Sequence, residues 1–343
     1  MSSLNRKLTA IIVILVFLII VLLCAGFLIN RDTVIPPHIT PVKTDSAVPA
    51  PVYTFPFEQS QITISSPIDP SVYAGAKSSD KYTYTRGNVS DNLQLTDTYL
   101  SMINDPLQED FYTNLISALR TVREKQGLND DEYLEFITVF VQSIRYETIS
   151  ENPPKFPIET YVEQSGDCDD KSLLLAGILS REGYNVALLS FPNESHMAVG
   201  IVCPGTDYKN TGYAFVETTE LSFAGVPTEI LDGGTQLVSR PIVIPVGNGT
   251  KIYGSCGEGL YLDSVFHSSE TEVNTLSPRI DAMKVQMDSL YQAHDVNGYN
   301  MRVPIFNDLQ NKRLQYATIH NYILEHQFDR KGTYQYVKQN VPA

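Results

Sequence analysis

The 343-residue sequence contains only four cysteines, and no two of them stand in a Cys-x-x-Cys pair. This is too few for a scaffold held together by many disulfides, and the spacing lacks the paired ligands of a structural zinc site. We therefore expect no metal ion. Cys203 and Cys256 stand beside Pro204 and Gly257 in loop-like contexts. Outside the cell these two cysteines could form one disulfide, or they could simply be buried.

Positive charge is also scarce. The chain has 25 Lys and Arg against 39 Asp and Glu, a formal net charge of -14, and it has no run of Lys and Arg. Such a chain repels phosphate backbones, which excludes nucleic acid as the expected partner. The balanced composition, with 43% hydrophobic residues, is typical of a globular protein with one large domain or two modest ones.

One long apolar run stands near the N-terminus. Residues 8–29 begin with Leu8, end with Ile29 and include no charged residue. As a helix they would be about 33 Å long, which matches the hydrocarbon core of a bilayer. A cleaved signal peptide is the alternative, but the run is longer than the usual apolar region of such a peptide. The sequence therefore predicts a membrane anchor.

The charges beside this run predict its orientation. Arg6 and Lys7 precede it in a short segment without acidic residues, so residues 1–7 are expected in the cytoplasm and the body of the protein outside. Six prolines between residues 30 and 60 then predict an extended, semi-rigid linker.

Periodic apolar residues predict the helices of the body. A helix around residues 111–126 ends at Gly127, and a second begins after Asn129 and runs to about residue 144. Residues 61–100 are rich in Tyr, Ser and Thr, with short alternations such as Tyr82-Thr83-Tyr84-Thr85, and are expected to be irregular apart from one strand. Residues 236–265 are expected to form strands or loops, and two further helices are expected at about 279–293 and 307–326.

The segment Gly166-Asp167-Cys168-Asp169-Asp170-Lys171-Ser172 runs directly into an apolar stretch, residues 173–179. The pattern predicts a buried helix with Asp167 as its N-cap and Cys168 in its first turn. A helix N-terminus stabilises a thiolate and lowers the pKa of the thiol. Asp167, Asp169 and Asp170 act in the opposite direction, so a nucleophilic Cys168 would require an imidazolium partner.

His196 is the expected partner. Strands at 196–202 and 213–218 would form a hairpin, and pairing residue 202 with residue 211 places His196 directly opposite Glu217. Opposed side chains have Cβ atoms roughly 4.5–5.5 Å apart, so a carboxylate there could orient the imidazole. Asp207 is the alternative acid, ranked lower because it falls in the predicted loop.

These residues carry a family resemblance. The Gly-Asp-Cys segment, His196-Met197-Ala198-Val199-Gly200 and Phe215-Val216-Glu217-Thr218-Thr219 together resemble the transglutaminase-like superfamily over about residues 130–222. The resemblance implies a papain-like α+β fold, in which the cysteine-bearing helix packs on an antiparallel sheet. It also implies a catalytic triad of Cys168, His196 and Glu217, although the family usually has Asp at the third position.

The resemblance implies a cysteine hydrolase that cleaves peptide or amide bonds of a protein or peptide substrate through a thioester, with no cofactor. An amine-accepting transglutaminase and a non-catalytic cell-surface binding module on the same fold are the alternatives. For the oxyanion, the backbone N–H of Cys168 is the natural donor, with Gln164 and Tyr161 as candidate side-chain donors.

We expect six segments along the chain. They are a cytoplasmic stub (1–7), a transmembrane anchor (8–29), a Pro-rich extracytoplasmic linker (30–60), an N-terminal helical and irregular part (61–128), the catalytic core (129–230) and a C-terminal extension with two helices (231–343).

Overall fold

The computed structural model describes residues 9, 12–20, 32–44, 47–147, 153–231 and 234–342. Within them the chain mixes helices and strands, which agrees with the predicted α+β class at that level. Residues 12–20 are helical, but no helix of the described residues is both long enough and apolar enough to cross a membrane. Most of the predicted anchor, residues 8–29, and the predicted stub, residues 1–7, lie outside the described residues.

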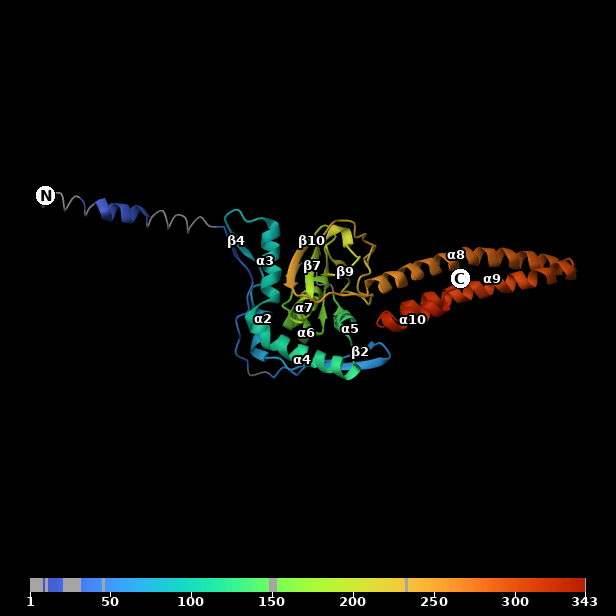
Figure 1. Ribbon diagram of the computed structural model, residues 1–343, viewed down its shortest axis with the longest axis horizontal. Helices are drawn as coiled ribbons and strands as arrows, with labels where there is room; N and C mark the ends of the chain where they lie inside the picture. Colours follow the sequence, from blue (N-terminus) through green and yellow to red (C-terminus); the bar gives the residue numbers. More distant parts are fainter. Residues whose placement is uncertain are drawn as a thin grey trace.

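A four-stranded antiparallel sheet lies at the centre of the body (Figure 1). Its strands, in spatial order, are β10 (Ile242–Asn248), β7 (Asn185–Phe191), β8 (His196–Ile201) and β9 (Ala214–Val216). Helix α7 (Cys168–Arg181) packs against this sheet, and its apolar residues 173–179 are fully or almost fully buried. The predicted buried helix and the strands around it are therefore confirmed, and β10 joins the sheet from beyond the predicted core of residues 129–230.

Two helices that precede α7 in the sequence also agree with the prediction. Helix α4 (Glu109–Gln126) ends at Gly127, whose left-handed backbone (φ 70°) closes the helix. Helix α5 (Asp130–Gln142) begins with a capping box, in which the side chains of Asn129 and Glu132 each accept a hydrogen bond from the other residue's backbone N–H. A short 3-10 turn, η1 (Pro106–Gln108), leads into α4, and α6 (Pro157–Glu163) precedes α7.

The predicted linker, residues 30–60, is not a free tether where the structure describes it. Strand β2 (Val52–Phe57) pairs with β3 (Ser60–Ser65), and its buried Tyr53, Phe55 and Phe57 contact aromatic rings of α5. These alternating aromatic residues form one buried face of a strand, a pattern that the prolines around them obscure. The prediction of an extended linker was therefore wrong for this part.

Residues 61–128 contain more regular structure than predicted, because residues 61–100 were expected to be irregular apart from one strand. Besides β3 and α4 they contain α2 (Pro70–Ser78), α3 (Asp91–Ile103) and β4 (Tyr84–Arg86), which pairs with β1 (Thr33–Ile35). Side chains of this segment belong to the same hydrophobic core as α5 and α7, so it is not a separate subdomain. Asp69 and Ser90 cap α2 and α3 through their side chains.

Gly75 gives a direct test of how the N-terminal segment packs. A Cβ atom on Gly75 would lie 2.4 Å from the backbone oxygen of Thr40 and 2.9 Å from Cα of Pro41. Gly75→Ala should therefore destabilise the protein by about 2 kcal/mol, as other overpacked sites do. Urea unfolding measures the change. Gly257→Ala is the control, because a Cβ there meets open space within a helix; equal stability of both variants would contradict the packing.

The C-terminal extension has longer helices than predicted and a third helix, and its first helix begins at Cys256, within the stretch 236–265 that was expected to form strands or loops. It contains α8 (Cys256–Gln292), α9 (Val296–Glu325) and α10 (Arg330–Asn340), so the predicted helices at 279–293 and 307–326 cover only parts of α8 and α9. Pro278 and Pro304 lie inside these helices. Isolated helices would be weakened there, but α8 and α9 pack along each other, and tertiary packing outweighs local propensity.

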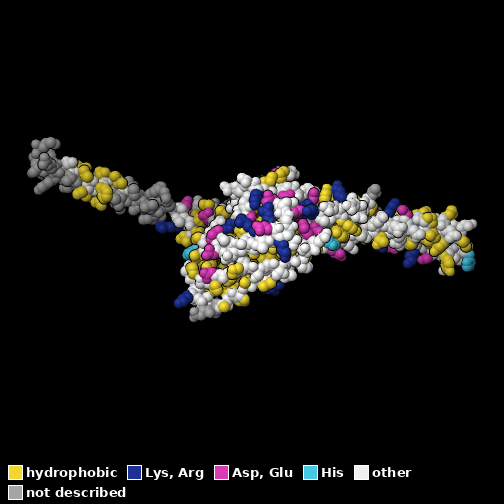
Figure 2. Space-filling model, turned by 60° about the horizontal axis from the view of Figure 1, so that its bottom comes forward, with side chains coloured by type: hydrophobic (Ala, Val, Ile, Leu, Met, Phe, Trp, Pro, Cys, Tyr) yellow, Lys and Arg dark blue, Asp and Glu magenta, His cyan; other side chains and the backbone are white. Residues whose placement is uncertain are grey.

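Helices α8 and α9 form an antiparallel arm that projects from the body (Figure 1). Helix α10 returns to α5, where Arg330 donates to Glu135 Oε1 at 2.7 Å and Lys331 to Glu132 Oε1 at 2.6 Å. Hydrophobic side chains are scattered over the arm up to its far end (Figure 2), and Tyr291 and Met301 are largely exposed there.

A disulfide joins the arm to the sheet. Cys203 follows β8, and its sulfur is bonded to that of Cys256, the first residue of α8. Of the two possibilities that the sequence left open, the structure has the disulfide.

Candidate active site

The start of α7 is fixed by a network of backbone and carboxylate contacts. Asp167 is the N-cap and accepts hydrogen bonds from the N–H groups of Asp169 and Asp170, while Asp170 accepts one from the N–H of Asp167. The N–H of Lys155 also donates to Asp170, at 2.6 Å. Cys168 is consequently the first residue of the helix, as predicted, and its position is well defined.

The sulfur of Cys168 lies against the beginning of β8. Its Sγ is 3.9 Å from the carbonyl oxygen of Ser195, and the backbone N–H of Met197 donates to it. These two contacts come from the residues immediately before and after His196. The structure therefore brings Cys168 and the His196 region of β8 together. Cys168 is 8% exposed, so the sulfur is nearly covered.

His196 and Glu217 form a buried pair. Nε2 of the histidine lies 3.3 Å from Oε2 of the glutamate, which leaves Nδ1 as the ring nitrogen for proton transfer. The other carboxylate oxygen, Oε1, accepts hydrogen bonds from the N–H groups of Thr218 and Thr219, both at 2.9 Å, and from the Thr219 hydroxyl at 2.7 Å. Glu217 is thus held in one orientation, with one oxygen directed at the imidazole.

The pairing of β8 with β9 differs from the predicted one by two residues. Val199 pairs with Val216, and Ile201 with Ala214, so His196 is not directly opposite Glu217. The loop between the strands contains the turn η2 (Tyr208–Asn210), and β9 ends before Glu217. Because side chains alternate along a strand, a shift of two residues keeps both on the same face, and the longer glutamate side chain makes the diagonal contact.

The electrostatics of the pair favour a charged glutamate. Burial alone would raise the pKa of Glu217, but the hydrogen bond and charge of His196, together with the donors of Thr219, lower the pKa to about 2. The carboxylate is therefore ionised at neutral pH, which is the form that stabilises an imidazolium.

This lowered pKa predicts a pH-dependent stability. Because the folded-state pKa is below the ordinary glutamate value of 4.5, Glu217 stabilises the fold above about pH 4.5, and this contribution is lost as the pH falls toward 2. The shift corresponds to about 3 kcal/mol. Urea unfolding of the wild type and Glu217→Gln between pH 7 and pH 2 should show a difference that shrinks over this range. A difference in the free energy of unfolding that does not change with pH would contradict this prediction.

The thiol does not behave as the helix N-terminus predicted. Burial raises the pKa of Cys168, and the negative charges of Asp169 and Asp167 raise it further, while the N–H of Met197 opposes them weakly. Asp169 Oδ1 lies only 3.5 Å from Sγ. Burial and adjacent negative charge thus raise the thiol pKa in the resting structure, whereas a helix N-terminus alone would lower it.

Two buried residues support the site without having been predicted. The fully buried Lys171 donates to the carbonyls of Gln142, Ile144 and Thr219, and the Gln142 amide donates to the carbonyl of Glu217 at 2.9 Å. Burial lowers the pKa of Lys171 to about 8, and the charge of Glu217 opposes this. Both residues fix the segment that carries Glu217. The sequence signal was a lysine three residues after Cys168, just before the apolar stretch of residues 173–179.

The remaining candidates lie elsewhere. Tyr161 is fully buried, and its hydroxyl accepts a hydrogen bond from the N–H of Ser66 at 2.7 Å. The amide of Gln164 donates to the carbonyl of Val52 at 2.9 Å. Both side chains are therefore occupied by the N-terminal strands and are not placed as oxyanion donors. Asp207 accepts from the N–H of Gly212 within the loop, so Glu217 is the acid of the pair.

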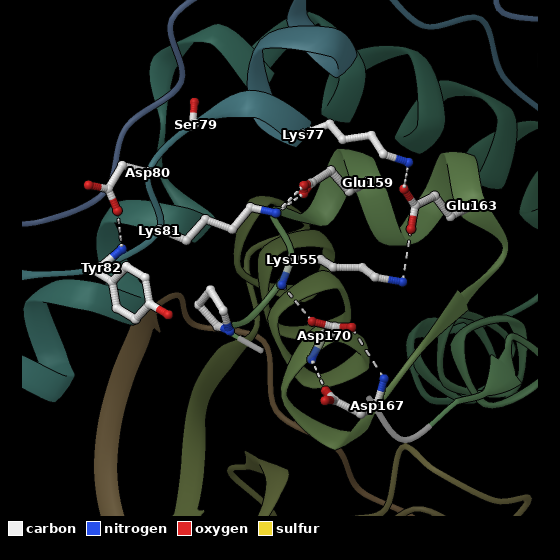
Figure 3. Close-up of a pocket in the computed structure, with 11 residues that line it drawn as sticks. Lys77, Ser79, Asp80, Lys81, Tyr82, Lys155, Glu159, Glu163, Asp167 and Asp170 are labelled. Atoms are coloured by element: carbon white, nitrogen blue, oxygen red, sulfur yellow. Dashed lines mark hydrogen bonds and ion pairs between the residues drawn. The ribbon is translucent and has the colours of Figure 1, made fainter. Parts of the chain in front are cut away.

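A polar cavity of about 410 Å³ lies beside the capped start of α7 (Figure 3). Lys77 and Lys155 both pair with Glu163, and Lys81 pairs with Glu159 at 2.6 Å. Cys168, His196 and Glu217 do not line it. These ion pairs connect α2 and the residues after it with α6, and the loop before α6 contacts the start of α7 through Lys155 and Asp170. Within the described residues, no group of three or more His, Cys, Asp or Glu side chains is arranged to hold a metal ion.

Comparison with protein-family models, with curated proteins and with solved structures finds no match to this chain.

Proposed function

We propose that the protein is a membrane-anchored, extracytoplasmic cysteine hydrolase of the transglutaminase-like, papain-like type, which cleaves amide bonds of a protein or peptide. The observation that carries the proposal is the arrangement of three residues from separate segments. Cys168 opens a buried helix, its sulfur contacts the backbone on both sides of His196, and His196 is paired with an ionised Glu217.

The chemistry follows from this arrangement. His196 takes the thiol proton of Cys168 while the sulfur attacks the carbonyl carbon of an amide, and Glu217 stabilises the imidazolium that forms. The backbone N–H of Cys168 is not taken by the Asp167 carboxylate and is the donor for the oxyanion. His196 then protonates the departing amine as the C–N bond breaks, which leaves a thioester. Water attacks the thioester, its proton passes to His196, and the acid and the thiol are released.

The location outside the cytoplasm is supported by two features. The Cys203–Cys256 disulfide is typical of an oxidising compartment. Residues 8–29 have the length and composition of a membrane anchor, preceded by Arg6 and Lys7.

One observation favours a second candidate, a cell-surface binding module without turnover. The raised pKa of the Cys168 thiol is what an unreactive, buried cysteine would have. An amine acceptor in place of water would make the protein a transglutaminase, and both chemistries begin with the same thioester.

Turnover of the full chain in mild detergent tests the proposal. The substrates are unfolded proteins rich in glutamine, with and without a fluorescent primary amine. Peptide-bond cleavage or ammonia release that is absent in Cys168→Ala supports hydrolysis, whereas incorporation of the amine supports transfer. A peptide or protein that binds equally well to the wild type and Cys168→Ala, without conversion, would overturn the enzymatic proposal in favour of the binding module.

A further inference from the structure

A second carboxylate lies beside the sulfur of Cys168. Asp169 Oδ1 is 3.5 Å from Sγ, and Oδ2 accepts a hydrogen bond of 2.9 Å from the hydroxyl of Tyr99. Tyr99 comes from α3, which packs against α7, and its ring is buried. The aspartate therefore bridges the nucleophile and a fixed tyrosine from a segment that is 70 residues away in sequence.

Asp169 has no cationic partner within the described part of the chain other than the nearby His196. Of the neighbouring groups, the N-cap Asp167, Asp170 on its own helix and Glu217 directly after β9 are acidic. Lys171 directs its ammonium group at the backbone carbonyls of Gln142, Ile144 and Thr219 instead.

We propose that Asp169, held by Tyr99, determines when Cys168 becomes a nucleophile: its negative charge keeps the thiol protonated until a positively charged group of the substrate neutralises it. This inference rests on the proposed function and extends it to the class of substrate. Asp169 is half-buried, so part of its surface is open to an incoming group; burial and the charge of Asp167 raise its pKa, and the hydrogen bond from Tyr99 opposes this rise. The thiol pKa, raised by burial and then by Asp169, agrees with this order of events.

The chemistry of the ligand follows. A cation within contact distance of Asp169 cancels the charge that opposes the thiolate, and proton transfer from Cys168 to His196 then becomes easier. The substrate is accordingly an amide with a cationic group next to the bond that is cleaved, such as a free α-amino group or a lysine side chain. The net charge of -14 attracts the same class.

Methanethiosulfonates of different charge test the inference without turnover. The Cys168 thiolate attacks the sulfenyl sulfur, a mixed disulfide forms and methanesulfinate leaves, so that only access and ionisation of Cys168 are measured. The full chain is used with Cys24→Ala, which leaves Cys168 as the single thiol outside the disulfide. The rate of each reagent with Cys168 is divided by its rate with a small free thiol. On this scale a trimethylammonium reagent should react at least tenfold faster than the neutral methyl reagent.

Asp169→Asn should abolish this preference and shift the pH profile of the neutral reagent to lower pH. Asp288→Asn on the exposed arm removes one charge far from the site and should retain the preference. Tyr99→Phe removes a donor that favours the charged form of Asp169, so on acidification its preference should disappear at a higher pH than in the wild type. A preference that survives in Asp169→Asn, or is lost equally in Asp288→Asn, would overturn the inference. Because the experiment measures labelling of Cys168, it tests the inference even if the protein turns over no substrate.

Discussion

His196→Ala is expected to lower the rate at which an activated ester acylates Cys168 by about 10²- to 10⁴-fold, the usual contribution of a general base. The reason is that burial, Asp169 and Asp167 all oppose ionisation of the thiol, so the imidazole is the group that can accept its proton. The measurement is the initial release of p-nitrophenol together with the mass of the acylated protein.

Two variants sharpen this test. His267→Ala removes a largely exposed histidine of α8 and should acylate at the wild-type rate. Glu217→Gln keeps the shape of the side chain but not its charge, and it should slow acylation less than loss of the imidazole does. An acylation rate that is equal in the wild type and His196→Ala would mean that the two residues are neighbours without a catalytic relation.

Removal of the disulfide is expected to have the largest effect on stability. The Cys203–Cys256 bond closes a loop with a sequence separation of 53 residues, which corresponds to about 4 kcal/mol in the chain-entropy account. The double variant Cys203→Ala with Cys256→Ala should therefore unfold at a clearly lower urea concentration than the wild type.

A matched comparison separates the effect of losing the disulfide bond from the effect of replacing the two side chains. Dithiothreitol should destabilise the wild type by a similar amount and leave the double variant unchanged. If the double variant were as stable as the oxidised wild type, the bond would not hold the start of α8 against the sheet.

The arrangement of Cys168, His196 and Glu217 was largely predictable from the sequence because it depends on local rules. An N-cap aspartate and an apolar stretch determine that Cys168 opens a helix, and strand alternation places His196 and Glu217 on one face. The exact pairing of β8 with β9 was not predictable, since the loop between these strands contains a turn whose residues the sequence pattern does not reveal. His196 and Glu217 are nevertheless in contact, because the observed pairing differs from the predicted one by an even number of residues, which keeps both side chains on the same face.

Other parts depend on contacts between distant segments and could not be predicted. Tyr99 reaches Asp169 from α3, a helix that its weak periodicity did not reveal. Lys171 and Gln142 acquire their roles only when α5, α7 and the segment after β9 come together. Likewise, α8 and α9 extend through Gly and Pro residues because each helix supports the other, which single-helix propensities do not include.

The most direct test of the central claim is the rate of Cys168 alkylation by iodoacetamide as a function of pH, in the full chain with Cys24→Ala, with and without His196→Ala. We predict that loss of the imidazole slows alkylation at pH 7 at least tenfold, because His196 assists removal of the proton from a thiol whose own pKa is raised in both proteins. Identical pH profiles for the two proteins would contradict the Cys168–His196 pair and leave the binding module as the better account.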